Sequence, residues 1–215
     1  RSHREIFAGD HFQLPPTVKS KKAEDLGLKE TLFERCMHLE NVSVMLNTQY
    51  RMHEKIMDFS NAQFYSGGLK ADASVKDTVL SFDENEPLLN TALDFIDTAG
   101  CGYTEILNPE SLSTANPEEV KLLLDHLKIL IGHYEQNNPS GKKITIGIIS
   151  PYKEQVQHLT ISVQEDDFLT NYSSQIAIKT LDGFQGQERD VIYISLVRSN
   201  DRMEIGFLSD TRRMN

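Results

Sequence analysis

The sequence has few cysteines, no long apolar run and fewer basic than acidic residues. Each of these features argues against a class of protein. Only Cys36 and Cys101 are cysteines among its 215 residues, and no Cys/His group has the spacing of a zinc cluster. No apolar run approaches the roughly 18 residues that cross a bilayer, and no signal-peptide core follows the first residues. The formal net charge of -10 argues against a strongly basic nucleic-acid-binding module, although an acidic protein can carry a locally positive groove. We therefore expect reduced cysteines, no metal site, no membrane contact and a cytoplasmic location, with the nucleus left open.

Two patterns that nucleotide-hydrolysing proteins often carry are also absent. The sequence has no phosphate loop of the form G-x-x-x-x-G-K-[ST] and no acidic pair placed after it to hold magnesium. Residues 141–143 (GKK) lack both the earlier glycine and the following hydroxyl. No carboxylate pair, Ser/His/Asp set or Cys/His set in the sequence has the pattern of an independent active site. The sequence therefore does not predict a complete hydrolytic centre.

The hydrophobic pattern predicts alternating strands and helices. Short apolar runs rich in β-branched residues predict strands at residues 5–8, 42–46, 93–97, 144–150, 176–180 and 191–197. Helical spacing of apolar residues predicts helices at residues 31–38, 53–64, 116–134 and 152–163. Residues 66–92 show weak periodicity and predict a long excursion. Strands that alternate with helices indicate an α/β fold with a parallel sheet flanked by helices.

The first polar cluster covers residues 9–16, with the sequence GDHFQLPP. It follows a predicted strand, and the carboxyl ends of parallel strands are where open α/β sheets bind ligands. Gly9 allows close approach, and the carboxamide of Gln13 can orient a water or a phosphate oxygen because it both donates and accepts. The alternative is a plain strand-to-loop turn that Asp10 caps.

The second cluster covers residues 49–52, with the sequence QYRM, directly after a predicted strand. The guanidinium of Arg51 carries a permanent charge and presents a fork that fits phosphate oxygens. The alternative is an exposed Tyr-Arg pair at a helix start, with Arg51 in a surface salt bridge.

The third cluster covers residues 180–190, with the sequence TLDGFQGQERD. Gly186 permits a tight turn and close backbone contact with a phosphate. Thr180 and Gln185 can donate hydrogen bonds to the phosphate backbone of a nucleic-acid strand, and Glu188 can accept from ribose hydroxyls. The alternative is a glycine-containing loop between strands, with a solvated Glu188.

A fourth, shorter cluster covers residues 150–153, with the sequence SPYK, after another predicted strand. The hydroxyl of Ser150 and the helix N-terminus that follows can hold a phosphate. A simple helix start explains these residues equally well.

The order and spacing of the first three clusters resemble the later half of a superfamily 1 helicase motor, of the kind found in the nonsense-mediated-decay helicase and its relatives. The resemblance extends over nearly the whole chain. It implies a RecA-like fold of the P-loop NTPase type without its own P-loop. Residues 1–40 would be the tail of a first motor domain and a connector, and residues 41–215 a second RecA-like domain truncated at its C-terminus. The phosphate loop and magnesium ligands would precede Arg1, and the second catalytic arginine would follow Asn215.

The resemblance also implies roles for individual residues. Catalytic roles fall on Gln13, which would sense the terminal phosphate of ATP, and on Arg51, while Tyr50 would stack on the adenine ring. The residues expected to face ATP are Gly9, Asp10, Gln13, Tyr50, Arg51, Gly186 and Glu188. The residues expected to face the nucleic acid are Ser150, Tyr152, Thr180, Asp182 and Gln185.

The expected function is therefore that of the C-terminal motor domain of an ATP-dependent helicase. Its cofactors would be ATP and Mg²⁺, and its partners single-stranded DNA or RNA and the first motor domain, with travel in the 5′ to 3′ direction as a family expectation. The isolated chain is expected to bind ATP weakly and to hydrolyse none. Two alternatives remain: a non-catalytic RecA-like interaction module, and a small-nucleotide hydrolase that nucleic acid does not stimulate.

Overall fold

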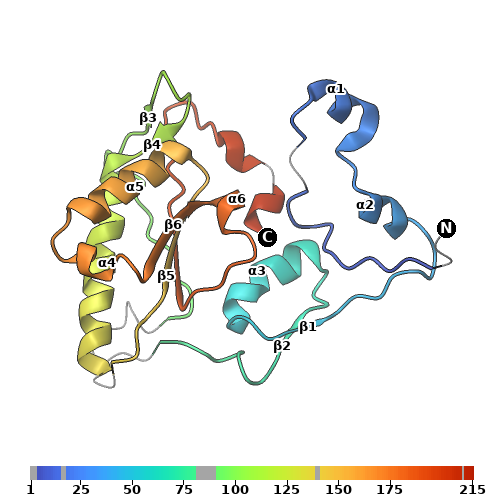
Figure 1. The fold of residues 1–215 in the computed structure, drawn as a ribbon, viewed down its shortest axis with the longest axis horizontal. Coiled ribbons are helices and arrows are strands. Elements are labelled where there is room, and N and C mark those ends of the chain that lie inside the picture. Colours follow the sequence, from blue (N-terminus) through green and yellow to red (C-terminus); the bar gives the residue numbers. More distant parts are fainter. Residues whose placement is uncertain (1–3, 16–17, 81–90, 139–140, 210) are drawn as a thin grey trace. The chain divides into compact units, whose positions relative to one another are not determined.

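The structure, a computed structural model, describes residues 4–15, 18–80, 91–138, 141–209 and 211–215 (Figure 1). The chain forms two compact units, residues 1–77 with 210–215 and residues 78–209. The expected boundary between two motor domains, near residue 40, lies within the first unit and stays a prediction. None of the described helices is both long and apolar enough to span a bilayer.

The second unit contains a three-stranded parallel sheet with the strand order β6-β5-β7. Its strands are β5 (Ile146–Ser150), β6 (Ile176–Thr180) and β7 (Val191–Ile194). Because parallel neighbours need a crossover, α5 (Lys153–Glu165) connects β5 to β6. Together with α4 (Pro117–Asn137) it flanks the sheet (Figure 1). The predicted RecA-like α/β class, with a parallel sheet flanked by helices, is confirmed.

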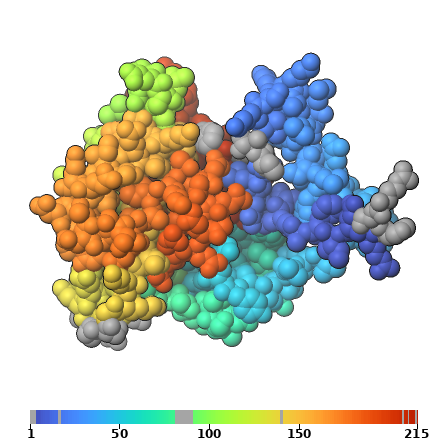
Figure 2. Space-filling model, in the orientation of Figure 1, coloured from blue at the N-terminus to red at the C-terminus, as the bar shows by residue number. Residues whose placement is uncertain are grey.

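The core of the second unit lies between the sheet and α4. The helix begins as its sequence predicts, because Asn116 Oδ1 accepts a hydrogen bond from the Glu119 N–H at 3.1 Å and Pro117 occupies the first helical position. The buried apolar side chains include Leu123, Leu127, Ile131 and Tyr134 of α4, Ile146 and Ile148 of β5, and Leu159 and Val163 of α5. In the space-filling view, the yellow and orange segments that carry this core adjoin (Figure 2).

The other face of β5 packs against α6 (Leu181–Phe184) through a glycine. A Cβ atom on Gly147 would lie 2.6 Å from Cζ of Phe184 and 2.8 Å from Cδ1 of Ile192. Since real Cβ atoms do not approach so closely, only glycine lets the buried Phe184 ring reach the backbone of the central strand. The sheet therefore has apolar packing on both faces at this position.

Short elements complete both units. In the second unit these are β3 (Ile106–Leu107) paired antiparallel with β4 (Thr114–Ala115), and the 3₁₀ turns η2 (Leu169–Tyr172) and η3 (Gly206–Ser209). The first unit contains α1 (Lys21–Ala23), η1 (Glu24–Leu28), α2 (Leu32–Met37), β1 (Thr48–Gln49), α3 (Glu54–Phe64), β2 (Lys70–Ala71) and η4 (Thr211–Met214). In this unit β1 pairs in parallel with β2, and α3 connects them.

Most predicted elements are confirmed. The helices α2, α3, α4 and α5 lie where residues 31–38, 53–64, 116–134 and 152–163 predict them, and β5, β6 and β7 lie within residues 144–150, 176–180 and 191–197. The last strand is shorter than predicted, because it ends at Ile194 and Val197 adopts a left-handed backbone with a φ of 73°.

Three predicted strands are wrong: residues 5–8, 42–46 and 93–97 form no strand. Their apolar side chains are solvent-exposed, with exposed fractions of 95% for Ile6, 91% for Val44 and 80% for Phe95. A strand is stable only when a neighbour pairs with it, and no described strand pairs with these segments. The excursion predicted at residues 66–92 contains β2, and its residues 81–90 lie outside the described part.

We expect Gly147→Ala to lower the free energy of unfolding by about 1–3 kcal/mol, because the new methyl group overpacks against Phe184 and Ile192. Gly132→Ala is the matched control: Gly132 lies inside α4 and nothing lies within 4 Å of the added methyl. It should raise stability by about 0.5–1 kcal/mol, since alanine is the better helix former. Chemical denaturation measures both, and equal effects would contradict the packing described.

Candidate functional site

The Gly-Asp cluster of the first unit is a turn organised by one carboxylate. Asp10 Oδ1 accepts a hydrogen bond from the Phe12 N–H at 3.0 Å, and Asp10 Oδ2 accepts from Gln13 Nε2 at 2.9 Å. The hydroxyl of Tyr65 also donates to Asp10 Oδ2. The side chain of Gln13 is exposed but held in one direction. The turn thus combines the predicted capping by Asp10 with an oriented carboxamide.

Aromatic packing fixes this turn against the C-terminal end of α3. The Phe12 ring lies 5.4 Å from the Tyr65 ring in an edge-on arrangement and 6.1 Å from the Phe64 ring, measured between centroids. A Cβ atom on Gly9 would lie 3.6 Å from the Phe33 ring, an ordinary contact distance. The packing against the Phe33 ring of α2 therefore does not require a glycine at position 9.

The second cluster is a turn that Gln49 closes. Its Oε1 accepts from the N–H groups of Arg51 and Met52 at 2.8 and 2.9 Å, and its Nε2 donates to the Met52 carbonyl at 2.8 Å. The Tyr50 ring is 67% exposed, and Arg51 is exposed as well. Sequence reasoning assigned no role to Gln49, although its position as the first residue of the QYRM cluster could have indicated one. Its hydrogen bonds present Tyr50 and Arg51 outward.

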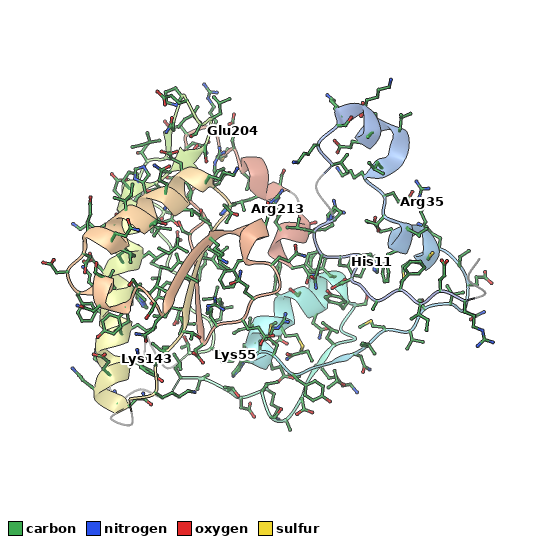
Figure 3. All side chains as sticks on the ribbon, viewed as in Figure 1. His11, Arg35, Lys55, Lys143, Glu204 and Arg213 are labelled. Carbon is green, nitrogen blue, oxygen red and sulfur yellow. The ribbon has the colours of Figure 1, made fainter. Side chains whose placement is uncertain are left out.

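The two clusters of the first unit lie at opposite ends of α3. Gln13 belongs to the turn packed on the C-terminal end, whereas Arg51 precedes the N-terminal end of a helix about 16 Å long. In Figure 3, His11 lies beside the far end of the helix from Lys55. The structure does not bring Gln13 and Arg51 together. The predicted meeting of these two side chains is therefore not seen in the first unit. Glu188 and Gly186 belong to the second unit, so their approach to a nucleotide stays a prediction.

In the second unit, two candidate nucleic-acid contacts end neighbouring strands. Ser150 of β5 and Thr180 of β6 are register partners, so the turns that follow both strands begin at one edge of the sheet. Ser150 is fully buried and its hydroxyl accepts from the Tyr152 N–H at 3.3 Å. The Thr180 hydroxyl caps α6 by accepting from the Gly183 N–H at 3.3 Å. Both hydroxyls shape the turns, and Ser150 offers no exposed contact of its own.

The exposed polar groups at this edge follow those hydroxyls. Asp182 and Gln185 are exposed, and Tyr152 is half-buried. The hydroxyl of Tyr152 lies 3.5 Å from Nη1 of Arg198, which also pairs with Glu105 through Nε at 3.0 Å. Sequence reasoning missed Arg198, whose only signal was a charged residue at the end of an apolar run. It adds a positive charge beside Tyr152.

The glycine-containing loop is tied down along its length. Gly186 has a φ of 80°, which other residues rarely adopt, so the sharp turn needs glycine there. Gln187 Nε2 donates to the Gly183 carbonyl at 3.1 Å, and the Arg189 guanidinium lies 5.6 Å from the centre of the Phe184 ring. These contacts hold the exposed Glu188 between two anchored neighbours.

A carboxylate fixes the far end of the loop to the sheet. Asp190 Oδ2 accepts from the backbone N–H and the hydroxyl of Thr145, at 2.8 and 2.6 Å. Burial alone would raise the pKa of Asp190, but the hydrogen bonds from Thr145 and the nearby positive charge of Lys142 together outweigh burial, and the pKa is lowered. Asp190 therefore stays ionised and anchors the loop to the residue that precedes β5.

A buried network of polar side chains, which sequence reasoning missed, connects the elements of the second unit around the sheet. Gln155 of α5 is fully buried; its Nε2 donates to Ser195 Oγ at 2.9 Å, and its Oε1 accepts from the Asn116 N–H at 2.8 Å. Asn116 Nδ2 donates to the Val197 carbonyl at 3.2 Å, and Glu119 accepts from the Val197 N–H at 2.9 Å. Buried amides need such partners. The network joins α4, α5 and the segment after β7.

The described residues do not fit a magnesium ion. No three His, Cys, Asp or Glu side chains within them are grouped so as to hold a metal. Cys36 and Cys101 are both free thiols. The groups that suit a nucleotide are instead an exposed ring at Tyr50, an exposed guanidinium at Arg51 and an oriented carboxamide at Gln13.

Comparison with known proteins places the chain in a family. The sequence pattern of the AAA domain family matches residues 28–215. The chain is 36% identical over 228 residues to the DNA polymerase alpha-associated DNA helicase A of Saccharomyces cerevisiae, covering 99% of this chain and 32% of that protein. It is 39% identical over 217 residues to the DNA-binding protein SMUBP-2 of Rattus norvegicus, covering 98% of this chain and 20% of that protein.

A third relative is the Regulator of nonsense transcripts 1 homolog of Drosophila melanogaster, 38% identical over 217 residues, which cover 98% of this chain and 17% of that protein. The chain thus spans between a sixth and a third of the length of these relatives. It aligns with them over nearly its whole length, including the Gly-Asp cluster that precedes residue 28. The chain therefore belongs to the AAA domain family and is a helicase-family domain of the superfamily 1 type.

Proposed function

We propose that this chain is the C-terminal motor domain of an ATP-dependent superfamily 1 helicase and supplies half of an ATP site and part of a nucleic-acid track. The observation that carries the proposal is the family match over residues 28–215, which includes the QYRM cluster, the SPYK turn and the glycine-containing loop. In this proposal a first motor domain contributes the phosphate loop and the magnesium ligands. The cellular location proposed is the cytoplasm.

The nucleotide would be bound through residues of the Gly-Asp cluster, the QYRM cluster and the glycine-containing loop. Tyr50 offers an exposed aromatic face for a base, and Arg51 offers a charged fork for phosphate oxygens. Gln13 would orient a water or a phosphate oxygen, with Gly9 and Asp10 forming its turn. Gly186 and Glu188 of the glycine-containing loop would also face the nucleotide. The chain alone, without a phosphate loop, would bind ATP weakly and hydrolyse none.

The nucleic-acid track would follow the carboxyl edge of β5 and β6. The register pairing of Ser150 with Thr180 supports this placement, because it starts both turns at one edge. Gln185 and Thr180 would contact phosphates, with Tyr152 and Asp182 beside them, whereas the buried Ser150 would shape the turn. Contacts to the backbone do not separate DNA from RNA.

Two other functions are less well supported. A non-catalytic interaction module has no need of phosphate-facing groups, yet Gln13, Arg51 and Glu188 are all present and exposed. A small-nucleotide hydrolase would gain nothing from the paired turns at the sheet edge. It predicts that nucleic acid leaves ATP hydrolysis by the full-length protein unchanged.

We expect Arg51→Ala in the full-length protein to lower the rate of ATP hydrolysis about 10³-fold or more while ATP still binds, because the guanidinium would act on charge that develops during phosphoryl transfer. Arg202→Ala is the matched control, since Arg202 is 84% exposed and pairs only at 4.0 Å with Glu204. Steady-state hydrolysis with single-stranded nucleic acid present measures both. Undiminished hydrolysis by Arg51→Ala would refute the half-site.

We expect Gln185→Ala to weaken binding of single-stranded nucleic acid about 2- to 12-fold, the range that one neutral hydrogen bond contributes. The loss should be the same for different base sequences, because the proposed contact is to the phosphate backbone. Gln157→Ala is the control, an exposed glutamine on α5. Fluorescence anisotropy with labelled oligonucleotides measures the affinities, and equal affinities for both variants would place the track elsewhere.

A further inference from the structure

The hydroxyl of Tyr65 is not needed to end α3. The last turn closes without it, because the Gly67 N–H donates to the Asn61 carbonyl at 3.0 Å and the Gly68 N–H to the Tyr65 carbonyl at 2.8 Å. The Asn61 side chain adds two hydrogen bonds to Leu69, at 2.8 and 3.1 Å. The phenol ring packs on Phe12 whether or not it carries a hydroxyl. The hydroxyl therefore serves something other than the helix end.

The hydroxyl is directed at the Gly-Asp cluster. It donates to Asp10 Oδ2 across 55 residues of sequence and accepts from Asn215 Nδ2 at 2.8 Å. Burial, and next the hydrogen bond to Asp10, raise the pKa of Tyr65 to about 12, so the phenol remains a donor at neutral pH. Asp10 Oδ2 thus receives two donors, the Tyr65 hydroxyl and the Gln13 amide.

This arrangement decides which end of the Gln13 carboxamide is exposed. Asp10 Oδ2 is the acceptor of this hydrogen bond, so Gln13 turns its NH₂ group toward Asp10. Its carbonyl Oε1 accepts no hydrogen bond in the part of the chain that the structure describes. The carbonyl and the second N–H remain for a ligand, the first to accept from a water and the second to donate to a phosphate oxygen.

We propose that Tyr65 is a positioning residue that holds Asp10 and, through Asp10, sets the orientation of the Gln13 carboxamide toward the nucleotide. This inference rests on the proposed function, because it assigns Gln13 to the ATP site. It ties the end of α3, the helix that follows the QYRM cluster, to the Gly-Asp cluster. Tyr65 itself touches no substrate and acts only through its two hydrogen-bonded neighbours.

The test compares Tyr65→Phe, Gln13→Ala and the double variant in the full-length helicase. Tyr65→Phe keeps the ring and removes the hydroxyl; we expect kcat for nucleic-acid-stimulated ATP hydrolysis to fall about tenfold while KM for ATP stays within about twofold. The double variant should be no slower than Gln13→Ala alone, because both changes act on the same carboxamide. A structural role would instead multiply the two losses.

A second variant and a matched control complete the design. Asp10→Asn keeps the shape of the side chain but can donate as well as accept, so it should lower kcat to the level of Tyr65→Phe. Tyr172→Phe removes a hydroxyl that likewise donates to a carboxylate, Glu135 at 2.7 Å, in the other unit, and should leave kcat unchanged. Melting temperatures confirm that all variants fold.

The outcomes separate the two proposals. If Gln13→Ala leaves hydrolysis intact, the assignment of Gln13 to the ATP site fails and the role of Tyr65 fails with it. If Gln13→Ala is slow but Tyr65→Phe is as fast as the unaltered helicase, only the positioning role is refuted. The same holds if the two losses multiply in the double variant.

Discussion

The bare backbone of Gly147 is the constraint on which the arrangement of the second unit depends. Because β5 carries no side chain at Gly147, the buried Phe184 ring packs directly on the central strand, and the Arg189 guanidinium lies over that ring. At the far end of the same loop, Asp190 bonds to Thr145 just before β5. The glycine-containing loop is therefore fastened to one strand at its middle and at its end, which gives Gln185 and Glu188 defined positions.

Much of this fold follows from the sequence, because the elements that formed as predicted carry their own local signals. Helix α4 has an asparagine cap, a proline at its first position and apolar residues at helical spacing, and β5 to β7 are β-branched runs that bury against it. Residues 42–46 and 93–97 have the same composition, yet they remain exposed and unpaired in the described structure. An apolar composition shows that a segment can be buried. Whether it forms a strand depends on a neighbouring strand to pair with, and the segment's own sequence does not identify that neighbour.

The candidate site divides in the same way. Clusters such as GDHFQLPP and QYRM could be found because their residue types stand together in the chain. The groups that hold them could not: Tyr65 reaches Asp10 from 55 residues away, and Gln155 meets Asn116 and Ser195 only in the folded core. Ser150 shows a further limit: the sequence allowed its hydroxyl either to hold a phosphate or to belong to a simple helix start, and only the structure shows that it is buried and accepts from the Tyr152 N–H. The sequence shows which polar residues stand together in the chain, but it does not show which distant residues hold them in place by hydrogen bonds.

The pairing of Ser150 with Thr180 has a mechanical consequence. Strand register is quantised, because a slip of one residue would shift β6 by about 3.3 Å and turn every side chain to the opposite face. The spacing between the two turns is thus set by backbone hydrogen bonds rather than by the turns themselves. Any movement of this sheet would therefore carry the turns after Ser150 and Thr180 together as one rigid body, with the distance between them unchanged.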